Sequence, residues 1–287
     1  MTTDTFTIVG LSGSLRAESF NTALLRESAR LAPEDVAVDV VVPGDLPLFN
    51  TDLERAGLPE SVVDLRARVA AADGLLVATP EYNFSVTGVV KNTIDWLSRG
   101  GPASPLHHKP TGLLSSAGGS GGSHALRHLR QILSHTRVRV LATPEVRVRR
   151  GSEHFIEGRL TTPEVAADII ALLSGLRALA GRDHDVPDVP GSVFVVGSEV
   201  RSADLIAALI AERGVRTLTA LTRTDTGRLL EARSISAVVI DPALAPEDAD
   251  LVAKDVREIA PGAPVVRPER IEGAADLVVT ALRESIE

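Results

Sequence analysis

The strongest constraint on the fold is the alternation of two kinds of segment along the chain. Short apolar runs, such as GLLVAT at 74–79, alternate with longer amphipathic runs, such as residues 60–71. A continuous apolar run of this length is typical of a strand that is covered on both faces, as the strands of parallel sheets are. The alternation therefore predicts an α/β fold, with helices on both faces of a parallel sheet.

The same pattern gives approximate bounds for the elements of the first 182 residues. The expected strands are 6–11, 36–42, 74–79, 111–117 and 138–142, and the expected helices are 22–32, 60–71, 87–98, 123–136 and 161–180. Five strands connected in this way are compatible with the doubly wound order 2-1-3-4-5.

A polar stretch at 183–191, which contains Pro187 and Pro190, interrupts both periodicities and is typical of an interdomain linker. We therefore expect a first domain at 1–182 and a smaller α/β domain at 192–287. Strands are expected in the second domain at 192–197, 215–221, 236–241 and 263–267, and helices at 203–212, 248–259 and 274–285.

Composition excludes several classes of function. The 287 residues include no cysteine, so disulfides, thiolate nucleophiles and cysteine metal sites are excluded, and redox chemistry would need a bound cofactor. A net charge of −8 disfavours nucleic acid as a partner. The first residues lack the basic and apolar regions of a signal peptide, and no apolar run approaches the roughly 20 residues of a membrane span. We expect a cytoplasmic protein without a membrane partner.

The loop after the first expected strand is rich in hydroxyl groups. It holds Ser14, Arg16, Ser19 and Asn21, with Gly13 at its start, and leads into the first helix. The unpaired N–H groups of a helix N-terminus favour a phosphate, which hydroxyls and a guanidinium would bind further. An ordinary capped turn is the alternative reading. The loop lacks the motifs of triphosphate and dinucleotide sites, so a monophosphate is the phosphate that it favours.

A second cluster follows the third expected strand, in TPEYNFSVTG at 79–88. Tyr82, the only tyrosine of the chain, stands close to Phe84 in a sequence with 3% aromatic residues. Because this loop lies at the carboxyl edge of the sheet, where such folds bind ligands, we interpret it as a wall beside a flat ring. Pro80 would stiffen the wall and Asn83 would offer hydrogen bonds. The alternative is a loop that packs its aromatic side chains against its own domain.

A third cluster, GGSGG at 118–122, follows the fourth expected strand, and its glycines permit close approach of a ligand to the backbone. The run also satisfies the G-x-S-x-G nucleophile pattern with Ser120 at its centre. A serine hydrolase, with Asp168 or Asp183 and His184 as partners, is therefore a rival hypothesis, although no HGGG-type oxyanion segment is present.

Two further features suggest no function of their own. His124 and His128 are four residues apart on an expected helix, but no acidic residue completes a metal site, so we expect a solvated or pocket-edge pair and no metal. The basic stretch at 137–150 alternates in a way that places arginines on the exposed face of a strand. It lacks the interleaved aromatic residues of a nucleic-acid site.

Three segments together carry a family resemblance. GSLRAESFN at 13–21, TPEYNFSVTGVVKNTIDWLSR at 79–99 and GGSHALRHLRQIL at 121–133 resemble the NADPH-dependent FMN reductase family of flavodoxin-like proteins. The branch that they are most similar to is that of bacterial chromate and quinone reductases. The resemblance covers residues 5–182 approximately, and it implies a flavodoxin-like fold.

The resemblance also implies a cofactor and the residues around it. The residues implied to contact the FMN phosphate are Ser14, Arg16, Ser19 and Asn21. The residues implied to line the isoalloxazine ring are Pro80, Glu81, Tyr82 and Asn83, with Ser116 and Gly118 on the other side. No protein group is implied as a catalytic acid or base.

In the implied reaction, NADPH or NADH reduces FMN, which then reduces a small-molecule acceptor such as a quinone, an azo compound, a chromate-like metal species or free flavin. A homodimer or homotetramer is implied as well. A flavodoxin-type electron carrier or a flavin-binding sensor is the alternative.

The second domain lies beyond the usual length of that family. SAVVIDP at 236–242 resembles a receiver domain with Asp241 as the phosphate acceptor, but the acidic pair and the lysine of such domains are not at their places. We expect a degenerate α/β module that governs assembly or docks a protein partner, without a second flavin.

Overall fold

The structure, a computed structural model, describes residues 5–182, 191–221 and 235–285. Contacts within the chain divide it into two compact units, Met1–Arg182 and Asp183–Glu287. The expected linker at 183–191 lies outside the described residues except for Gly191. Among the described residues, no helix has both the length and the apolarity needed to span a bilayer.

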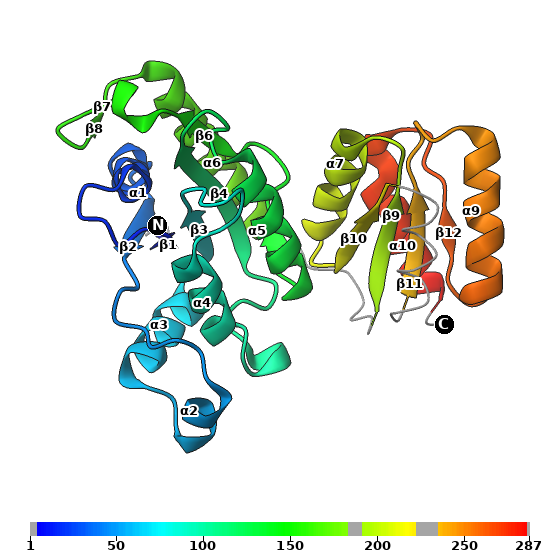
Figure 1. The fold of residues 1–287 in the computed structure, drawn as a ribbon, viewed down its shortest axis with the longest axis horizontal. Helices are drawn as coiled ribbons and strands as arrows, with labels where there is room; N and C mark the ends of the chain where they lie inside the picture. The colour runs from blue at the N-terminus through cyan, green and yellow to red at the C-terminus, as the bar shows by residue number, and fades with distance from the viewer. Residues whose placement is uncertain (1–4, 183–190, 222–234, 286–287) are drawn as a thin grey trace. The chain divides into compact units, whose positions relative to one another are not determined.

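The first unit contains the expected strands and helices, with small shifts at their ends (Figure 1). Its main strands are β1 (Phe6–Ser12), β2 (Val36–Val41), β3 (Gly74–Ala78), β4 (Pro110–Ala117), β5 (Arg139–Val140) and β6 (Val146–Arg149). Its α-helices are α1 (Phe20–Leu31), α2 (Thr51–Ala56), α3 (Glu60–Ala71), α4 (Gly88–Leu97), α5 (Ser123–His135) and α6 (Pro163–Ala180). Short 3-10 turns and a hairpin of β7 (Phe155–Ile156) and β8 (Arg159–Leu160) complete the unit.

The sheet of this unit is parallel and has the order β2-β1-β3-β4-β5, which confirms the predicted fold class. The chain winds outward from β1 in both directions, so the order reverses between β1 and β3. In open α/β sheets, ligands bind outside the carboxyl ends of the strands at such a reversal. The loops that follow β1, β3 and β4 therefore meet at the edge where a site is expected.

The fifth strand position differs from the expectation of one strand at 138–142. Two short segments share it, since β5 pairs with the start of β4 and β6 pairs with its end, from Leu114↔Val146 to Ala117↔Arg149. Pro144 lies between the two segments and has no N–H to donate to a ladder, which accounts for the interruption. Along β6 buried valines alternate with exposed arginines, as expected. The expectation of exposed arginines was wrong for Arg137 and Arg139, which are buried. The guanidinium of Arg139 donates to the carbonyl of Leu179 at 2.8 Å.

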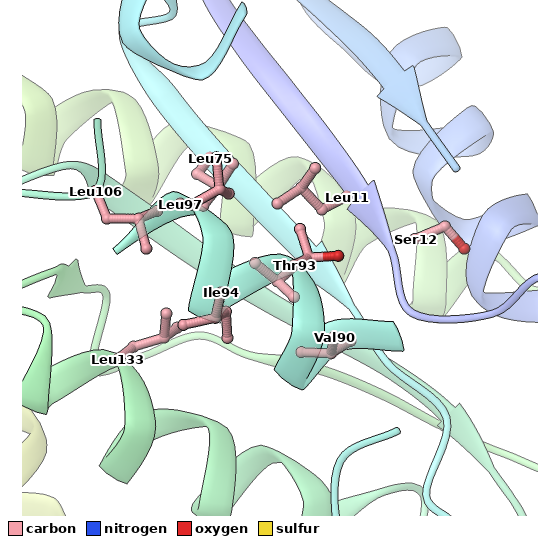
Figure 2. Close-up of a pocket in the computed structure, with 10 residues that line it drawn as sticks. Leu11, Ser12, Leu75, Val90, Thr93, Ile94, Leu97, Leu106 and Leu133 are labelled. Carbon is pink, nitrogen blue, oxygen red and sulfur yellow. The ribbon is translucent and has the colours of Figure 1, made fainter. Parts of the chain in front are cut away.

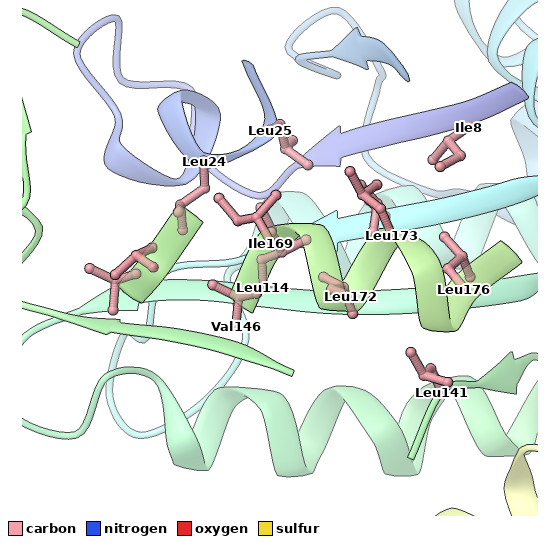
Figure 3. Packing of buried hydrophobic residues seen from close by; sticks show 14 of the residues in the cluster. Ile8, Leu24, Leu25, Leu114, Leu141, Val146, Ile169, Leu172, Leu173 and Leu176 are labelled. Atoms are coloured by element: carbon pink, nitrogen blue, oxygen red, sulfur yellow. The ribbon is translucent and has the colours of Figure 1, made fainter. Parts of the chain in front are cut away.

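Helices cover both faces of the sheet. On one face α1 and α6 pack against the strands, with Leu24, Ile169 and Leu172 among the buried side chains (Figure 3). On the other face α3, α4 and α5 do the same. A gap of about 10 Å³, lined mostly by apolar side chains such as Leu75 and Ile94, remains under α4 (Figure 2). It has room for one water molecule at most, so it is a packing gap in the core and not a ligand site.

The second unit repeats the same winding on a smaller scale. Its strands are β9 (Ser192–Val196), β10 (Thr217–Ala220), β11 (Ile235–Ile240) and β12 (Val265–Val266), and its helices are α7 (Val200–Ala211), α9 (Pro246–Ile259) and α10 (Ala274–Glu284). The strands are parallel in the order β10-β9-β11-β12. Helices α7 and α10 cover one face, and α9 covers the other.

Candidate functional site

Hydrogen bonds join the three segments that the sequence singles out at the carboxyl edge of the first sheet. The N–H of Gly13, just after β1, donates to the carbonyl of Ala78 at the end of β3 at 2.7 Å. The hydroxyl of Thr87, the N-cap of α4, donates to the carbonyl of Gly13 at 2.7 Å. A side chain at Gly13 would lie 2.5 Å from Val90 Cγ2, so this close approach requires glycine. Gly13 and Thr87 thus fix the loop after β1 against the loop after β3.

The loop after β1 presents the N-terminus of α1. Ser14 and Ser19 are buried, while Arg16 is exposed, with its guanidinium 5.4 Å from the centre of the Phe20 ring. Ser19 is the N-cap of α1 and accepts a hydrogen bond from the N–H of Thr22. The Ser14 hydroxyl accepts from the N–H of Arg16 at 3.4 Å. Both hydroxyls keep their protons available for an anion at the helix N-terminus.

Asn21 joins this loop to β4. Its side-chain amide donates to the carbonyl of Ser116 at 2.9 Å, and its side-chain oxygen accepts from the N–H of Ser116 at 2.8 Å. The pair of bonds resembles one step of a β-ladder made by a side chain. Asn21 therefore fixes the start of α1 against the end of β4, and its contact with a phosphate stays a prediction.

The hydroxyl of Ser116 is unpaired. Its residue is 5% exposed, and Ser116 Oγ has no hydrogen-bond partner among the described residues. It lies beside Gly151, where a Cβ atom would be 2.6 Å from Ser116 Oγ and 2.6 Å from the Phe20 ring. A buried hydroxyl without a partner costs free energy, so a polar group of a ligand at this edge would satisfy it.

The loop after β3 folds into a tight turn that exposes its aromatic side chains. Tyr82 and Ser85 exchange backbone hydrogen bonds at 3.1 and 3.0 Å, and Asn83 and Phe84 between them have φ of 50° and 59°. Tyr82 is 58% and Phe84 68% exposed, whereas Pro80 is buried. These aromatic side chains do not pack into the core of their own unit, which argues against the alternative reading of this loop.

Glu81 forms contacts that the sequence did not predict. One carboxylate oxygen accepts from the hydroxyl of Ser120 at 2.7 Å, and the other accepts from the N–H groups of His124 and Ala125 at 2.9 and 3.0 Å. Burial alone would raise the pKa of Glu81. The hydrogen bonds from Ser120, Ala125 and His124 outweigh burial and hold its pKa below the ordinary value. Glu81 is therefore an ionised cap on the N-terminus of α5.

The contacts of Ser120 argue against the hydrolase hypothesis. Its hydroxyl proton goes to Glu81, and its oxygen accepts from the N–H of Gly122 at 3.1 Å. A nucleophilic serine would instead donate to an imidazole base. Of the proposed partners, Asp183 and His184 lie outside the described residues.

Gly118 lies in the same glycine loop as Ser120 and is exposed. A Cβ atom at Gly118 would meet nothing within 4 Å, so its backbone borders open space.

Two histidines of α5, His124 and His128, contact the aromatic turn. The rings of His124 and Phe84 meet edge to face at 5.0 Å, and Nδ1 of His128 lies 3.0 Å from the hydroxyl of Ser85. Within the described residues, no group of three or more His, Asp or Glu side chains is arranged to hold a metal ion. His124 and His128 thus contact the aromatic turn. Their spacing of four residues on the expected helix was the sequence feature that placed them on one face.

Comparison with known proteins identifies the family. The family described as NADPH-dependent FMN reductase matches residues 6–153. The chain belongs to this family. A NAD(P)H-dependent FMN reductase of Pseudomonas aeruginosa is 42% identical over 159 residues, which are 55% of this chain and 85% of that protein. A probable NADPH:quinone oxidoreductase of Oryza sativa is 37% identical over 187 residues, which are 63% and 91% of the two chains.

Comparison with solved structures agrees with this family assignment. The flavoenzyme NAD(P)H:(acceptor) oxidoreductase FerB of Paracoccus denitrificans matches with a TM-score of 0.55 and 30% identity, covering 60% of this chain and 97% of that one. The family match ends at residue 153, so the second unit lies outside it.

Proposed function

We propose that the chain is an NAD(P)H-dependent oxidoreductase that works through bound FMN and passes electrons to a small-molecule acceptor, such as a quinone. The observation that carries the proposal is the convergence of three features at one sheet edge. These are the N-terminus of α1 with its buried serines, the exposed aromatic turn at 82–85, and the open backbone at Gly118. Membership of the family supports the same conclusion.

The phosphate of FMN would lie at the N-terminus of α1. Ser14 and Ser19 would donate hydroxyl protons to it, and the exposed guanidinium of Arg16 would add a charge-assisted bond. Asn21 would hold this loop in place through Ser116, whose unpaired hydroxyl fits a polar group of the cofactor.

The flat ring would lie between the turn after β3 and the glycine loop after β4. Pro80, Tyr82 and Asn83 would line one side and Gly118 the other, where no side chain obstructs the backbone. FMN held there would supply the hydride and electron-transfer chemistry that connects the nicotinamide with the acceptor. The chain itself binds and orients the reactants, and no side chain is required as an acid or base.

The oligomeric state, the cellular location and the domain roles are also part of the proposal. We expect a homodimer or homotetramer in the cytoplasm, with chromate-like metal species and azo compounds among the acceptors tested. We assign residues 1–182 to the reductase domain, 183–191 to a linker and 192–287 to a module that docks a partner or governs assembly. Deleting 192–287 should then alter the number of subunits in the oligomer or the set of proteins that the chain captures. A deletion without either effect would refute that role.

An anaerobic spectrum tests the proposed function directly. The purified protein, supplied with FMN, is expected to show flavin absorption bands that bleach on addition of NADPH, and to recover them when a quinone is added. Flavin bands that do not bleach would favour an electron carrier or a sensor. Failure to bind FMN would refute both readings.

A further inference from the structure

Helix α5 begins at a residue that cannot cap it. Its N-cap is Gly122, which has φ of 83° and offers no side chain to the first N–H groups of the helix. A Cβ atom at Gly122 would lie 1.8 Å from Ser115 Oγ, and that hydroxyl is held by its bond to the carbonyl of Thr79 at 2.6 Å. The close packing of β4 against β3 thus excludes a serine, threonine or aspartate at the usual capping position.

The missing cap comes from the other loop of the site. Glu81, about 40 residues earlier in the chain, accepts the N–H groups of His124 and Ala125 and the hydroxyl of Ser120. The helix α5 has 13 residues, and the positive end of its dipole favours a carboxylate there. A single side chain therefore links the segment after β3, the glycine loop and the start of α5.

The residues after Glu81 lie along the same helix. Phe84 contacts the ring of His124, and Ser85 lies within hydrogen-bond distance of His128, one turn further on. The turn has two residues other than glycine at positive φ, a conformation that persists only where surrounding contacts fix it. Glu81, His124 and His128 provide these contacts.

We propose that Glu81 is a positioning residue, which holds the aromatic turn and the glycine loop at the separation that fits the flavin ring, rather than a group that contacts the ring. The proposal rests on the proposed FMN function. It also means that the N-terminus of α5 is already neutralised by the protein and is closed to an anionic ligand. Ser120, the centre of the nucleophile-like pattern, acts as a member of this link.

The test compares three variants of the full chain with a matched control. Glu81→Ala removes the link, Glu81→Gln keeps its shape without the charge, and Ser120→Ala removes one of its bonds. Asp73→Asn is the control, because Asp73 accepts the N–H of Thr7 at 2.7 Å and its hydroxyl at 2.9 Å, at the opposite edge of the same sheet. The measurements are the Kd of FMN for protein freed of flavin, and the visible spectrum of the bound flavin.

Glu81→Ala is expected to weaken FMN binding at least tenfold and to shift the flavin bands towards those of free FMN. Glu81→Gln should restore most of the affinity, Ser120→Ala should show an intermediate loss of about threefold to tenfold, and Asp73→Asn should leave the Kd within twofold. Should Glu81→Ala fail to fold, Glu81→Gln and Ser120→Ala still carry the test.

Unchanged FMN affinity and spectrum in Glu81→Ala, or in Ser120→Ala if only that variant folds, would overturn this inference while the proposed function stands. An equal loss of FMN affinity in Asp73→Asn would show that the effect of Glu81→Ala comes from a general loss of stability. This result would also overturn the inference. A wild-type protein without FMN affinity would instead refute the proposed function.

Discussion

Replacement of Asn21 by alanine should lower both the stability of the first unit and its affinity for FMN. Asn21 is 3% exposed, and its side chain is the partner of both backbone groups of Ser116. Its removal leaves an N–H and a carbonyl at a buried residue without these partners. Each such group costs about 1–3 kcal/mol when it is left unpaired. Water that enters the space left by the amide would recover part of this, so we expect a loss of about 2–4 kcal/mol.

Asn92 provides a matched control for this substitution. Like Asn21 it makes one accepting and one donating bond to backbone groups, here from the N–H of Phe49 at 2.7 Å and to the carbonyl of Pro47 at 2.9 Å. The Pro47 carbonyl also accepts from the indole N–H of Trp96 at 2.8 Å and keeps that partner when Asn92 is removed. That loop is only partly buried, so water can replace the amide, and Asn92→Ala should cost about 1–2 kcal/mol in total.

Denaturant unfolding of the two variants measures the stability, and titration with FMN measures the affinity. Asn21→Ala should weaken FMN binding at least tenfold because the phosphate loop is no longer fixed to β4, while Asn92→Ala should leave binding within twofold. If Asn21→Ala lowered the free energy of unfolding by less than 1 kcal/mol, the hydrogen bonds to Ser116 would not hold these segments together, and the reasoning would fail.

Three further predictions follow from the same site. Arg16→Ala should weaken FMN binding about 10- to 100-fold by loss of a charge-assisted bond, with the unfolding free energy within about 0.5 kcal/mol of wild type, while the exposed Arg55→Ala in α2 should change neither. The lowered pKa of Glu81 means that its stabilising effect is complete above the ordinary value of 4.5 and is lost as the pH falls through the lower folded value. The difference in unfolding free energy between wild type and Glu81→Gln should therefore be constant above about pH 5.5 and shrink below 4.5, and a difference that vanished at pH 6 would contradict the assignment. The flavin content of the saturated full chain should be one FMN per chain, measured by absorbance after release, and a ratio near two would be the contrary result.

Most of the first sheet could be predicted because periodicity reports burial directly. The run at 74–79 is buried on both faces, and β3 forms there with every residue buried. Helix α2 was missed because none of its residues is buried, so its sequence, TDLERA, carries no apolar period. The side chain of Asn50 caps this helix. A capping residue is a local indication of a helix start, but here no apolar periodicity accompanies it.

The segments of the site were predictable, but the contacts between them were not. Ser and Gly at 12–14 and the aromatic pair at 82–84 are visible in the sequence as turn and ligand signals. The bonds of Asn21 to Ser116 and of Glu81 to α5 join residues 95 and about 40 positions apart, and no periodicity reports such a distance. One indirect signal existed. A glycine at 122, where the start of α5 needs a capping residue, indicates that the cap must come from elsewhere.

The second unit shows why the same winding need not produce the same site. Gly197 follows β9 as Gly13 follows β1, and each lies where the strand order reverses. At Gly13 the nearest backbone across the sheet is that of Ala78 and Thr79, and the serine hydroxyls of the following loop remain beside the helix. At Gly197 a Cβ atom would instead lie 2.8 Å from the carboxyl group of Asp241.

Asp241 is 1% exposed and accepts hydrogen bonds from the hydroxyl of Ser202, in the first turn of α7, and from the N–H of Ala243 at 2.8 Å. Its carboxyl group thus fills the space at the start of α7 that a phosphate would need, and it uses the hydroxyl that would bind one. Burial of this kind also removes Asp241 from contact with a phosphate donor, so neither a second flavin nor receiver-like phosphorylation is expected at this edge. The described residues of the second unit therefore supply a fold without the ligand chemistry of the first, which is why one FMN per chain is the expected content.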